Sequence, residues 1–291
     1  KDILIPAHGV YWPIMLKALG FTDEEMPTLL VHGWWNIAGA KMSKSLGNVV
    51  DPDLLADKYG PEALRYYLMS DIATGKDADF SEERLVQGYN AALANNLGNL
   101  LNRTLSMAGK YREGVLKRDA ANDDPAAQSI FDETPSESAG NARRTEDLKK
   151  LMAIGLGMGT AKVALTESIE RWRNADPSGA MVEVGRLSSA CNDFIEISAP
   201  WKLAKDPLRA DHLDAVLYTL AESLRIIAIL IWPVLPDAAH GIFDQLAWKL
   251  DEAGKDSRFR LDEAKWGSLP DGHVLGKPVP LFPRIEADPT R

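Results

Sequence analysis

The sequence predicts a mainly α-helical protein in which a short, incomplete α/β piece precedes a larger bundle of helices. Runs of β-branched and aromatic residues, which are typical of strands, occur only before Pro52. From Pro52 onward, apolar residues recur at spacings of three and four, which places them on one face of a helix. The 291 residues, 45% of them apolar, can bury the core of one large domain or of two ordinary ones.

The N-terminal part resembles the end of an α/β unit. Ile3 to Ile5 is a short apolar run that predicts a buried strand, and a helix is predicted from Trp12, with Pro13 in its first turn and Gly20 at its end. A second strand is predicted in P-T-L-L-V-H-G-W-W-N-I, before Gly39. Two strands are too few to form a buried sheet, so we expect that the sheet is incomplete here.

Helices account for most of the remaining chain. Residues 52–59 and 61–69 each begin with a proline, and Ser81 is a good cap for the helix that follows it. Further helices are predicted at 145–174, 178–197, 211–232 and 237–249, and residues 122–141, which lack apolar periodicity, predict a connection between helices. We divide the chain into 1–79, the α/β piece; 80–250, the helical bundle; and 251–291, a proline-rich extended tail.

Composition limits the possible functions. A net charge of −9 argues against unspecific attraction to nucleic acid, so such binding must depend on a local arrangement of residues. The single Cys191 excludes an internal disulfide and a thiolate-rich zinc site, and fits a cytoplasmic protein. No apolar run is long enough to span a membrane. The chain begins without Met and without a leader pattern, so we expect that an upstream part has been removed.

Residues 40–48, A-K-M-S-K-S-L-G-N, form a candidate phosphate-binding loop. Lys41 and Lys44 lie three residues apart beside Ser43, with Gly39 and Gly47 at the two ends. Lysine is a mobile point charge that can follow phosphate oxygens while negative charge moves between them. On composition alone, a solvated basic loop is the simpler interpretation, and the order of the five residues K-M-S-K-S is what favours a phosphate-binding role.

A second constellation lies on the helix after Ser81. Asn95, Asn99 and Arg103 are spaced by four, so a helix places them on one face, next to a stripe of leucines at positions 93, 97, 101 and 105. Amide and guanidinium groups can recognise base edges. Trp201, in A-P-W-K, could stack on an unpaired base or belong to the core. A polar, solvent-exposed helix face is the alternative for the asparagines.

These motifs carry a family resemblance. K-M-S-K-S is a signature of class I aminoacyl-tRNA synthetases, and its surroundings, H-G-W-W-N-I-A-G-A-K-M-S-K-S-L-G-N-V-V, resemble the methionyl-tRNA synthetases. The resemblance extends to K-D-I-L-I-P-A-H-G-V-Y-W-P, Y-G-P-E-A-L-R-Y-Y-L, D-F-S-E-E-R-L, A-N-N-L-G-N-L-L-N-R, A-P-W and P-L-F-P-R-I. It covers nearly the whole chain except residues around 122–141.

The resemblance implies a fold and a reaction. The α/β piece would be the C-terminal part of a Rossmann-like nucleotide-binding domain, and the bundle would bind an anticodon. In this family the carboxylate of methionine attacks the α-phosphate of ATP, pyrophosphate leaves, and the methionyl group passes to tRNA(Met). Lys41 and Lys44 would be the catalytic contacts to the departing phosphates, with Asp2 and Ser43 completing the ATP-binding residues.

The same resemblance assigns the other substrates. His8, Tyr11 and Trp12 match residues of the methionine pocket, although an ordinary core position remains open for each of them. Asn95, Asn99, Arg103 and Trp201 match the positions that recognise the CAU anticodon. ATP with Mg²⁺ would be a substrate, and neither a zinc site nor another metal site is expected in this chain.

The family's His-x-Gly-His signature does not occur in the sequence. We therefore expect this chain to be the C-terminal half of a methionine–tRNA ligase, to need an N-terminal half as a partner, and to be inactive alone. The alternatives are a class I synthetase of the isoleucine, valine, leucine or cysteine group, and a tRNA-binding module without a catalytic role. No membrane partner is expected.

Overall fold

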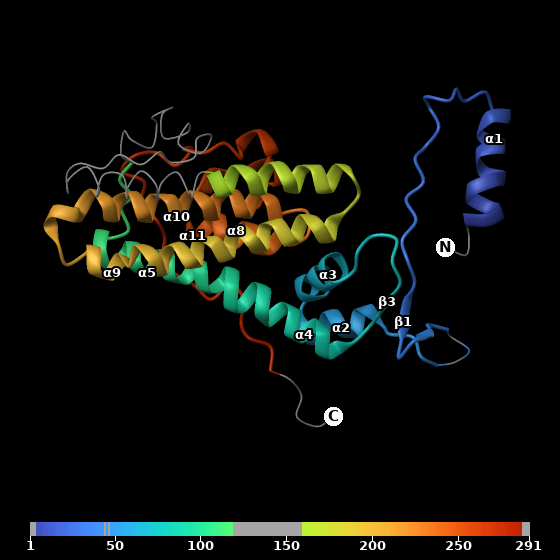
Figure 1. The fold of residues 1–291 in the computed structure, drawn as a ribbon, viewed down its shortest axis with the longest axis horizontal. Helices are drawn as coiled ribbons and strands as arrows, with labels where there is room; N and C mark the ends of the chain where they lie inside the picture. The colour runs from blue at the N-terminus through green and yellow to red at the C-terminus, as the bar shows by residue number, and fades with distance from the viewer. Residues whose placement is uncertain (1–3, 44, 46, 119–158, 287–291) are drawn as a thin grey trace, which may run out of the picture.

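The structure is a computed structural model that describes residues 4–43, 45, 47–118 and 159–286. In these residues helices dominate, and the strands form one small sheet (Figure 1), as the predicted fold class requires. The expectations for Ile3, for the connection at 122–141 and for the beginning of the helix at 145–174 lie outside the described residues. No helix in the described ranges has the length and apolar character of a membrane-spanning segment.

Residues 4–32, which we call the N-terminal arm, contain no buried residue. The arm begins with a π-helical turn, η1 (Leu4–Tyr11), followed by α1 (Trp12–Ala18), and Figure 1 shows α1 away from the bundle. The strand predicted up to Ile5 is wrong for its described residues, because no described strand lies beside them to share backbone hydrogen bonds. The helix predicted from Trp12 is confirmed, and Gly20 follows it with a φ of 94°.

The sheet is much smaller than the apolar runs suggested. It contains β1 (Trp35–Ile37), β2 (Ala40–Lys41) and β3 (Ala78–Asp79), in the order β2-β1-β3. β1 pairs antiparallel with β2 and parallel with β3. The sequence did not predict β3, because two residues are too few to show an alternating pattern.

Proline and capping signals place the helices after the sheet. α2 (Pro52–Tyr59) and α3 (Pro61–Ser70) both begin at proline, and Asp51 caps α2 by accepting from the Asp53 N–H at 2.9 Å. Ser81 Oγ accepts from the Arg84 N–H at 3.3 Å and so caps α4 (Glu82–Tyr89). These predicted helix starts are confirmed.

α4 continues into η3 (Asn90–Gly98), a π-helical segment, and then into α5 (Asn99–Arg112). The predicted leucine stripe is confirmed, since all four of its residues are buried: Leu93, Leu97, Leu101 and Leu105. The π-helical segment was not predicted, because the apolar spacing along it is compatible with an ordinary helix.

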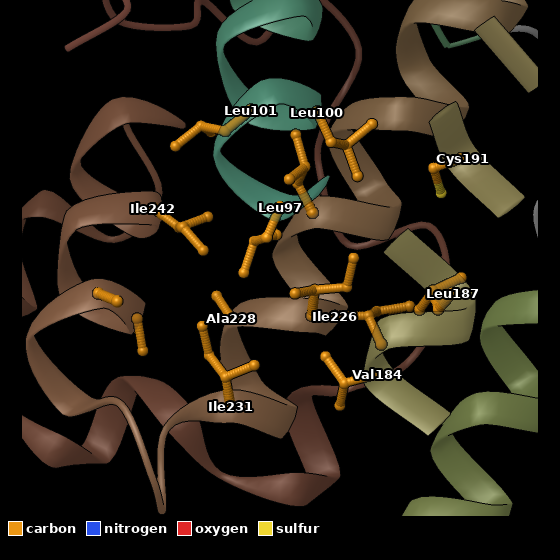
Figure 2. Packing of buried hydrophobic residues seen from close by; sticks show 14 of the residues in the cluster. Leu97, Leu100, Leu101, Val184, Leu187, Cys191, Ile226, Ala228, Ile231 and Ile242 are labelled. Carbon is orange, nitrogen blue, oxygen red and sulfur yellow. The ribbon is translucent and has the colours of Figure 1, made fainter. Parts of the chain in front are cut away.

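The bundle surrounds one central helix. Residues 159–173 are helical. They are followed by α8 (Pro177–Ser198), α9 (Pro200–Leu203), η5 (Pro207–Arg209), α10 (Ala210–Ile231) and α11 (Pro236–Gln245). Every residue from Leu213 to Ile231 is buried, which is typical of a helix covered on all sides. Figure 2 shows side chains of η3, α5, α8, α10 and α11 meeting in this core.

Residues 250–286, which we call the C-terminal segment, cross the bundle through short 3₁₀ turns and extended chain. The turns are η6 (Leu250–Glu252), η7 (Asp256–Phe259) and η8 (Leu261–Glu263). A fully buried ion pair holds this segment: Arg225 Nη2 donates to Glu222 Oε1 at 2.6 Å, and Arg225 Nη1 donates to the Glu263 carbonyl at 2.6 Å. Glu222 accepts in turn from the Ser268 N–H at 2.8 Å. Polar groups therefore help to hold this segment, together with buried apolar residues such as Phe259 and Leu269.

α3 joins the α/β piece to the bundle. Arg65 Nε donates to the Val234 carbonyl at 2.8 Å, next to the start of α11. The Glu62 carboxylate accepts from the first N–H groups of α11, those of Asp237 at 2.7 Å and Ala238 at 3.0 Å. These N–H groups have no partner within their own helix, so the carboxylate serves as their cap. Burial raises the pKa of Glu62, although these two hydrogen bonds lower it.

Candidate functional site

A tight hairpin positions the start of the lysine loop. Its turn residues, Ala38 and Gly39, have φ values of 51° and 75°, the positive values that two-residue hairpin turns favour. The Gly39 N–H donates to Asp79 Oδ1 at 2.9 Å, and Asp79 lies on β3 beside Asn36. Two neighbouring strands therefore fix the entry to the loop.

Aromatic side chains attach this hairpin to α3. The Trp35 ring lies 5.6 Å from the Tyr67 ring and 6.3 Å from the Phe80 ring, measured between centroids. Tyr67 also accepts a hydrogen bond from the Ser81 N–H at 3.2 Å, and burial raises the pKa of its hydroxyl. These contacts connect the hairpin before the loop to α3, which in turn contacts the bundle.

Lys41 and Ser43 lie at the beginning of the loop, and Lys44 lies outside the described residues. The Lys41 ammonium group is exposed and stands 4.2 Å from the centre of the Trp34 ring, a cation–π contact. Asn48 closes the loop: its Oδ1 accepts from the Ser43 N–H at 2.8 Å, and its Nδ2 donates to the Lys41 carbonyl at 3.2 Å. The sequence did not predict this role of Asn48, because a contact across the loop leaves no signal in the sequence.

The candidate methionine residues lie in the N-terminal arm. His8 and Trp12 touch edge to face with their ring centroids 5.9 Å apart, one helical turn from each other. His8, Tyr11 and Trp12 are all exposed, Tyr11 by 59% and Trp12 by 36%. The structure thus brings His8 and Trp12 together but leaves them open on one side, and Asp2 lies outside the described residues.

The predicted polar ladder follows η3 and α5. Asn95 and Asn99 are exposed, and Arg103 is one turn further along. Arg103 Nη2 donates to Glu196 Oε1, on α8, at 2.6 Å. Asn95 Oδ1 accepts from Arg284 Nε of the C-terminal segment at 3.1 Å, so Asn95 is already in contact with another part of the chain.

Trp201 lies where α8 turns into α9. The turn depends on Ala199, which has a φ of 45° and ends α8, and on Pro200, which is buried at the start of α9. Trp201 is 36% exposed, which leaves part of its ring available to a partner. Because Glu196 is in the last turn of α8, its contact with Arg103 brings α5 to the helix end that Trp201 follows.

Basic side chains surround this end of the bundle. Lys202, Lys205 and Arg209 are exposed and follow Trp201 closely in the chain. Two of the four cations here are ion-paired, Arg103 with Glu196 at 2.6 Å and Arg209 with Asp206 at 3.4 Å, which leaves Lys202 and Lys205 as the lysines nearest Trp201 in the chain. Sequence reasoning missed Lys202, Lys205 and Arg209, although their proximity to A-P-W was a usable signal. Cations next to a partly exposed tryptophan suit a single-stranded nucleic acid, since phosphates and a base can be bound together.

The described side chains contain no group of three or more His, Cys, Asp or Glu residues placed to hold a metal ion. The site offers cations and hydrogen-bond donors. At the lysine loop these can stabilise negative charge on phosphates. Near the end of α8, cations and hydrogen-bond donors lie close to Trp201 in the chain.

Two protein-family models match the chain. The model described as "tRNA synthetases class I (M)" matches residues 1–105. The model described as "Anticodon binding domain of methionyl tRNA ligase" matches residues 162–291. The first match contains the lysine loop and the second contains Trp201.

Curated relatives match nearly the whole chain. The methionine–tRNA ligase of Caldanaerobacter subterraneus subsp. tengcongensis is 37% identical over 98% of this chain, and the match covers 39% of that protein. The methionine–tRNA ligase of Nostoc sp. PCC 7120 is 39% identical over 98% of this chain, with 48% of that protein covered. The chain therefore spans less than half the length of these relatives.

Two solved structures are also similar to this chain. The chain is similar to Mycobacterium tuberculosis methionyl-tRNA synthetase in complex with methionyl-adenylate, with a TM-score of 0.75 and 29% identity over 97% of this chain and 48% of that one. The apo form of the Mycobacterium tuberculosis enzyme gives a TM-score of 0.72 and 26% identity, over 98% of this chain and 51% of that one.

Proposed function

Because this chain belongs to the methionyl-tRNA synthetase family, we propose that it carries the lysine loop and the anticodon-recognition bundle of a methionine–tRNA ligase. That enzyme uses ATP, with Mg²⁺, to activate methionine and transfers the methionyl group to tRNA(Met). The proposed division is residues 1–79 for the catalytic part, 80–250 for the bundle and 251–291 for the tail. The cytoplasm is the proposed location.

One observation carries the anticodon assignment. The contact between Arg103 and Glu196 joins the polar face of α5 to the end of α8, close in the chain to the partly exposed Trp201. Asn99 is exposed one turn before Arg103. A base that stacks on Trp201 would have the guanidinium group within the same surface, and the neighbouring lysines would contact phosphates. Asn95 would join this set once it is released from Arg284.

The lysine loop would act on the other substrate. Lys41 and Lys44, with Ser43 and Asp2, would bind ATP, and the two lysines would stabilise the charge that builds up as pyrophosphate leaves. The cation–π contact of Lys41 with Trp34 supports this role, because it holds the ammonium group at the start of the loop. The open His8–Trp12 pair would form one wall of the methionine pocket.

The proposed partner is the part of the enzyme that corresponds to the remaining length of the relatives. It would cover the exposed arm and supply the rest of the ATP and methionine sites. A chain that offers only one wall of each site has few of the contacts that position two substrates for reaction, so we propose that it is inactive alone.

The anticodon assignment can be tested by binding. The 291-residue chain is titrated against fluorescently labelled anticodon stem-loops that differ only in the loop, with CAU in one and the scrambled order UAC in the other. We expect tighter binding of CAU and weaker binding of both at high salt, because phosphate contacts release counterions. Equal affinity for the two loops would contradict the assignment.

The catalytic assignment needs a second experiment. ATP–pyrophosphate exchange dependent on methionine is followed for this chain, for a separately produced polypeptide that corresponds to the rest of the relatives, and for the mixture. We expect exchange in the mixture only, and loss of that exchange when Lys41 is changed to Ala. Strong exchange by this chain alone would overturn the proposal of two complementary parts.

A second candidate function is supported by the open His8–Trp12 pair: a tRNA-binding module without a catalytic role. It predicts RNA binding that is indifferent to the loop sequence, without any exchange in the mixture. A synthetase of the isoleucine, valine, leucine or cysteine group would instead prefer another anticodon. The matching family models, both of the methionyl type, favour methionine over that group.

A further inference from the structure

Asn96, next to the predicted ladder, makes a dense set of hydrogen bonds to α8. Its Oδ1 accepts from Ser188 Oγ at 3.0 Å and from Asn192 Nδ2 at 3.0 Å. Its Nδ2 donates to Ser189 Oγ at 3.0 Å and to the Gly185 carbonyl at 3.3 Å. A side-chain amide has two N–H groups and two lone pairs, so all of its capacity is used toward one neighbouring helix.

The backbone at Asn96 is unusual as well. Asn96 lies in the π-helical η3, immediately before α5, and Asn192 Nδ2 donates to the Asn96 carbonyl at 3.2 Å. A turn widened by one residue rotates everything after it by about 100° relative to a continuous α-helix, since each residue of an α-helix turns by that angle. Whether η3 keeps this conformation therefore decides which way Asn99 and Arg103 point.

A third segment supports the same turn from outside. A Cβ atom added to Gly98 would lie 3.3 Å from the Phe282 ring and 3.1 Å from the Leu93 carbonyl, so the C-terminal segment packs closely on η3. Asn90 at the start of η3 pairs with the backbone of Ile285: its Nδ2 donates to the carbonyl at 2.8 Å, and its Oδ1 accepts from the N–H at 3.0 Å.

The partners of Asn96 lie on the helix that leads to Trp201. Asn192 is one turn before Glu196, the residue that Arg103 contacts, and α9 follows directly. Asn96 and Asn192 thus connect η3 to α8 before the chain reaches the residues of the proposed RNA contact, Arg103 and Trp201. A change of rotation at this seam would move Arg103 relative to Trp201.

We propose that Asn96, acting with Asn192, is a positioning residue for anticodon recognition: it holds η3 against α8 and so sets the placement of Arg103 relative to Trp201. This inference rests on the proposed anticodon-binding function. Asn96 does not touch the RNA in this role. It acts through Arg103, which makes its effect separable from that of a residue that only stabilises the fold.

The test is a double-mutant cycle on the full chain. The wild type, Asn96→Ala, Arg103→Ala and the double variant are titrated with the CAU and scrambled stem-loops. We expect Asn96→Ala to weaken CAU binding by about tenfold and to leave the scrambled loop nearly unchanged. In the Arg103→Ala background, Asn96→Ala should change CAU binding by less than about twofold, because the group that it positions is gone.

Two further variants keep the test decisive. Ser189→Ala removes one of the four bonds to the Asn96 side chain, so it should show a smaller loss in the same pattern, and it carries the test if circular dichroism shows that Asn96→Ala is unfolded. Ser178→Ala is the matched control: it removes a polar contact of the same helix, to the Ser70 carbonyl at 3.0 Å, at the opposite end from Trp201. It should leave the ratio of the two affinities unchanged.

Each other outcome has a defined meaning. If Asn96→Ala weakens both loops equally, or weakens CAU equally in both backgrounds, Asn96 only stabilises the fold and the inference is overturned. An Arg103→Ala variant with unchanged CAU binding also overturns it. If the wild type itself does not distinguish the two loops, the proposed function fails first and the inference fails with it, which the wild-type titration alone reveals.

Discussion

The N-terminal arm and α10 have similar apolar side chains in opposite surroundings. In the arm, Ile5 is 75% exposed and Leu19 is 76% exposed, whereas every residue from Leu213 to Ile231 in α10 is buried. Burial of apolar surface stabilises by about 25 cal/mol per Å² removed from water, so only the second set contributes here. Apolar composition therefore indicates that a segment is suited to packing, but the tertiary structure decides whether it is packed.

The difference also separates the two proposed functions. The bundle supplies its own core, its own polar contacts and a surface with Arg103 and Trp201, so anticodon binding can belong to this chain. The arm carries His8 and Trp12 without a covering surface among the described residues. Methionine activation is accordingly the function that we expect to need a second part of the enzyme.

The largest expected change in stability concerns the buried ion pair in α10. Arg225→Ala leaves the Glu222 carboxylate buried without its partner, and we expect a loss of about 3–5 kcal/mol in the free energy of unfolding. The control is Arg260→Ala, which removes an exposed ion pair with Asp262 and should cost much less, because water screens exposed charges. Urea unfolding of both variants measures the difference, and similar losses would contradict it.

A matched pair of leucines tests the apolar contrast directly. Leu224→Ala in α10 opens a cavity in the core and should cost about 2–5 kcal/mol. Leu19→Ala in the arm removes a side chain that is already in water and should change the stability by less than about 0.5 kcal/mol. Thermal or urea unfolding gives both values. A large loss for Leu19→Ala would mean that the arm packs against the bundle in solution.

Two tryptophans with equal exposure sharpen the functional contrast. Trp12 in the arm and Trp201 at the end of the bundle are both 36% exposed. Trp201→Ala should weaken binding of the CAU stem-loop by about 1–3 kcal/mol, the contribution of one stacked base, and should affect the scrambled loop less. Trp12→Ala should leave RNA binding unchanged. Fluorescence anisotropy compares the four combinations, and equal losses on both loops would mean that Trp201 only packs.

The smallest expected effect concerns the junction between the two regions. Burial raises the pKa of Glu62, and a carboxyl group with a raised pKa in the folded state favours folding while it is protonated. This contribution is lost as the pH rises through the raised pKa. The wild type should therefore gain stability relative to Glu62→Gln, which keeps an acceptor oxygen for α11, when the pH is lowered through the raised pKa toward the ordinary value of 4.5.

Urea unfolding of the wild type and Glu62→Gln at a series of pH values measures this trend. A stability difference that stays constant, or that moves against the wild type on acidification, would contradict the sign. The same series run on Leu19→Ala, which removes no titratable group, provides a control outside the junction.

Features that depend on neighbouring residues could be predicted from the amino-acid sequence. Pro52, Pro61 and Ser81 mark helix starts because ring geometry and side-chain caps act within one turn. The leucine stripe was visible because helical periodicity repeats within the same element. The order K-M-S-K-S, together with the other motifs, was enough to indicate the family that the comparisons support.

Contacts between elements could not be predicted in this way. The pairing of Arg103 with Glu196 and the contact of Arg284 with Asn95 join residues that are far apart in the chain. The exposure of the arm and the π-helical turn at Asn96 depend on which other elements lie beside them. Their geometry depends on the rotation and register of whole helices. A helix rotates by about 100° for each residue of shift, so local propensity cannot specify which side chains meet across a seam.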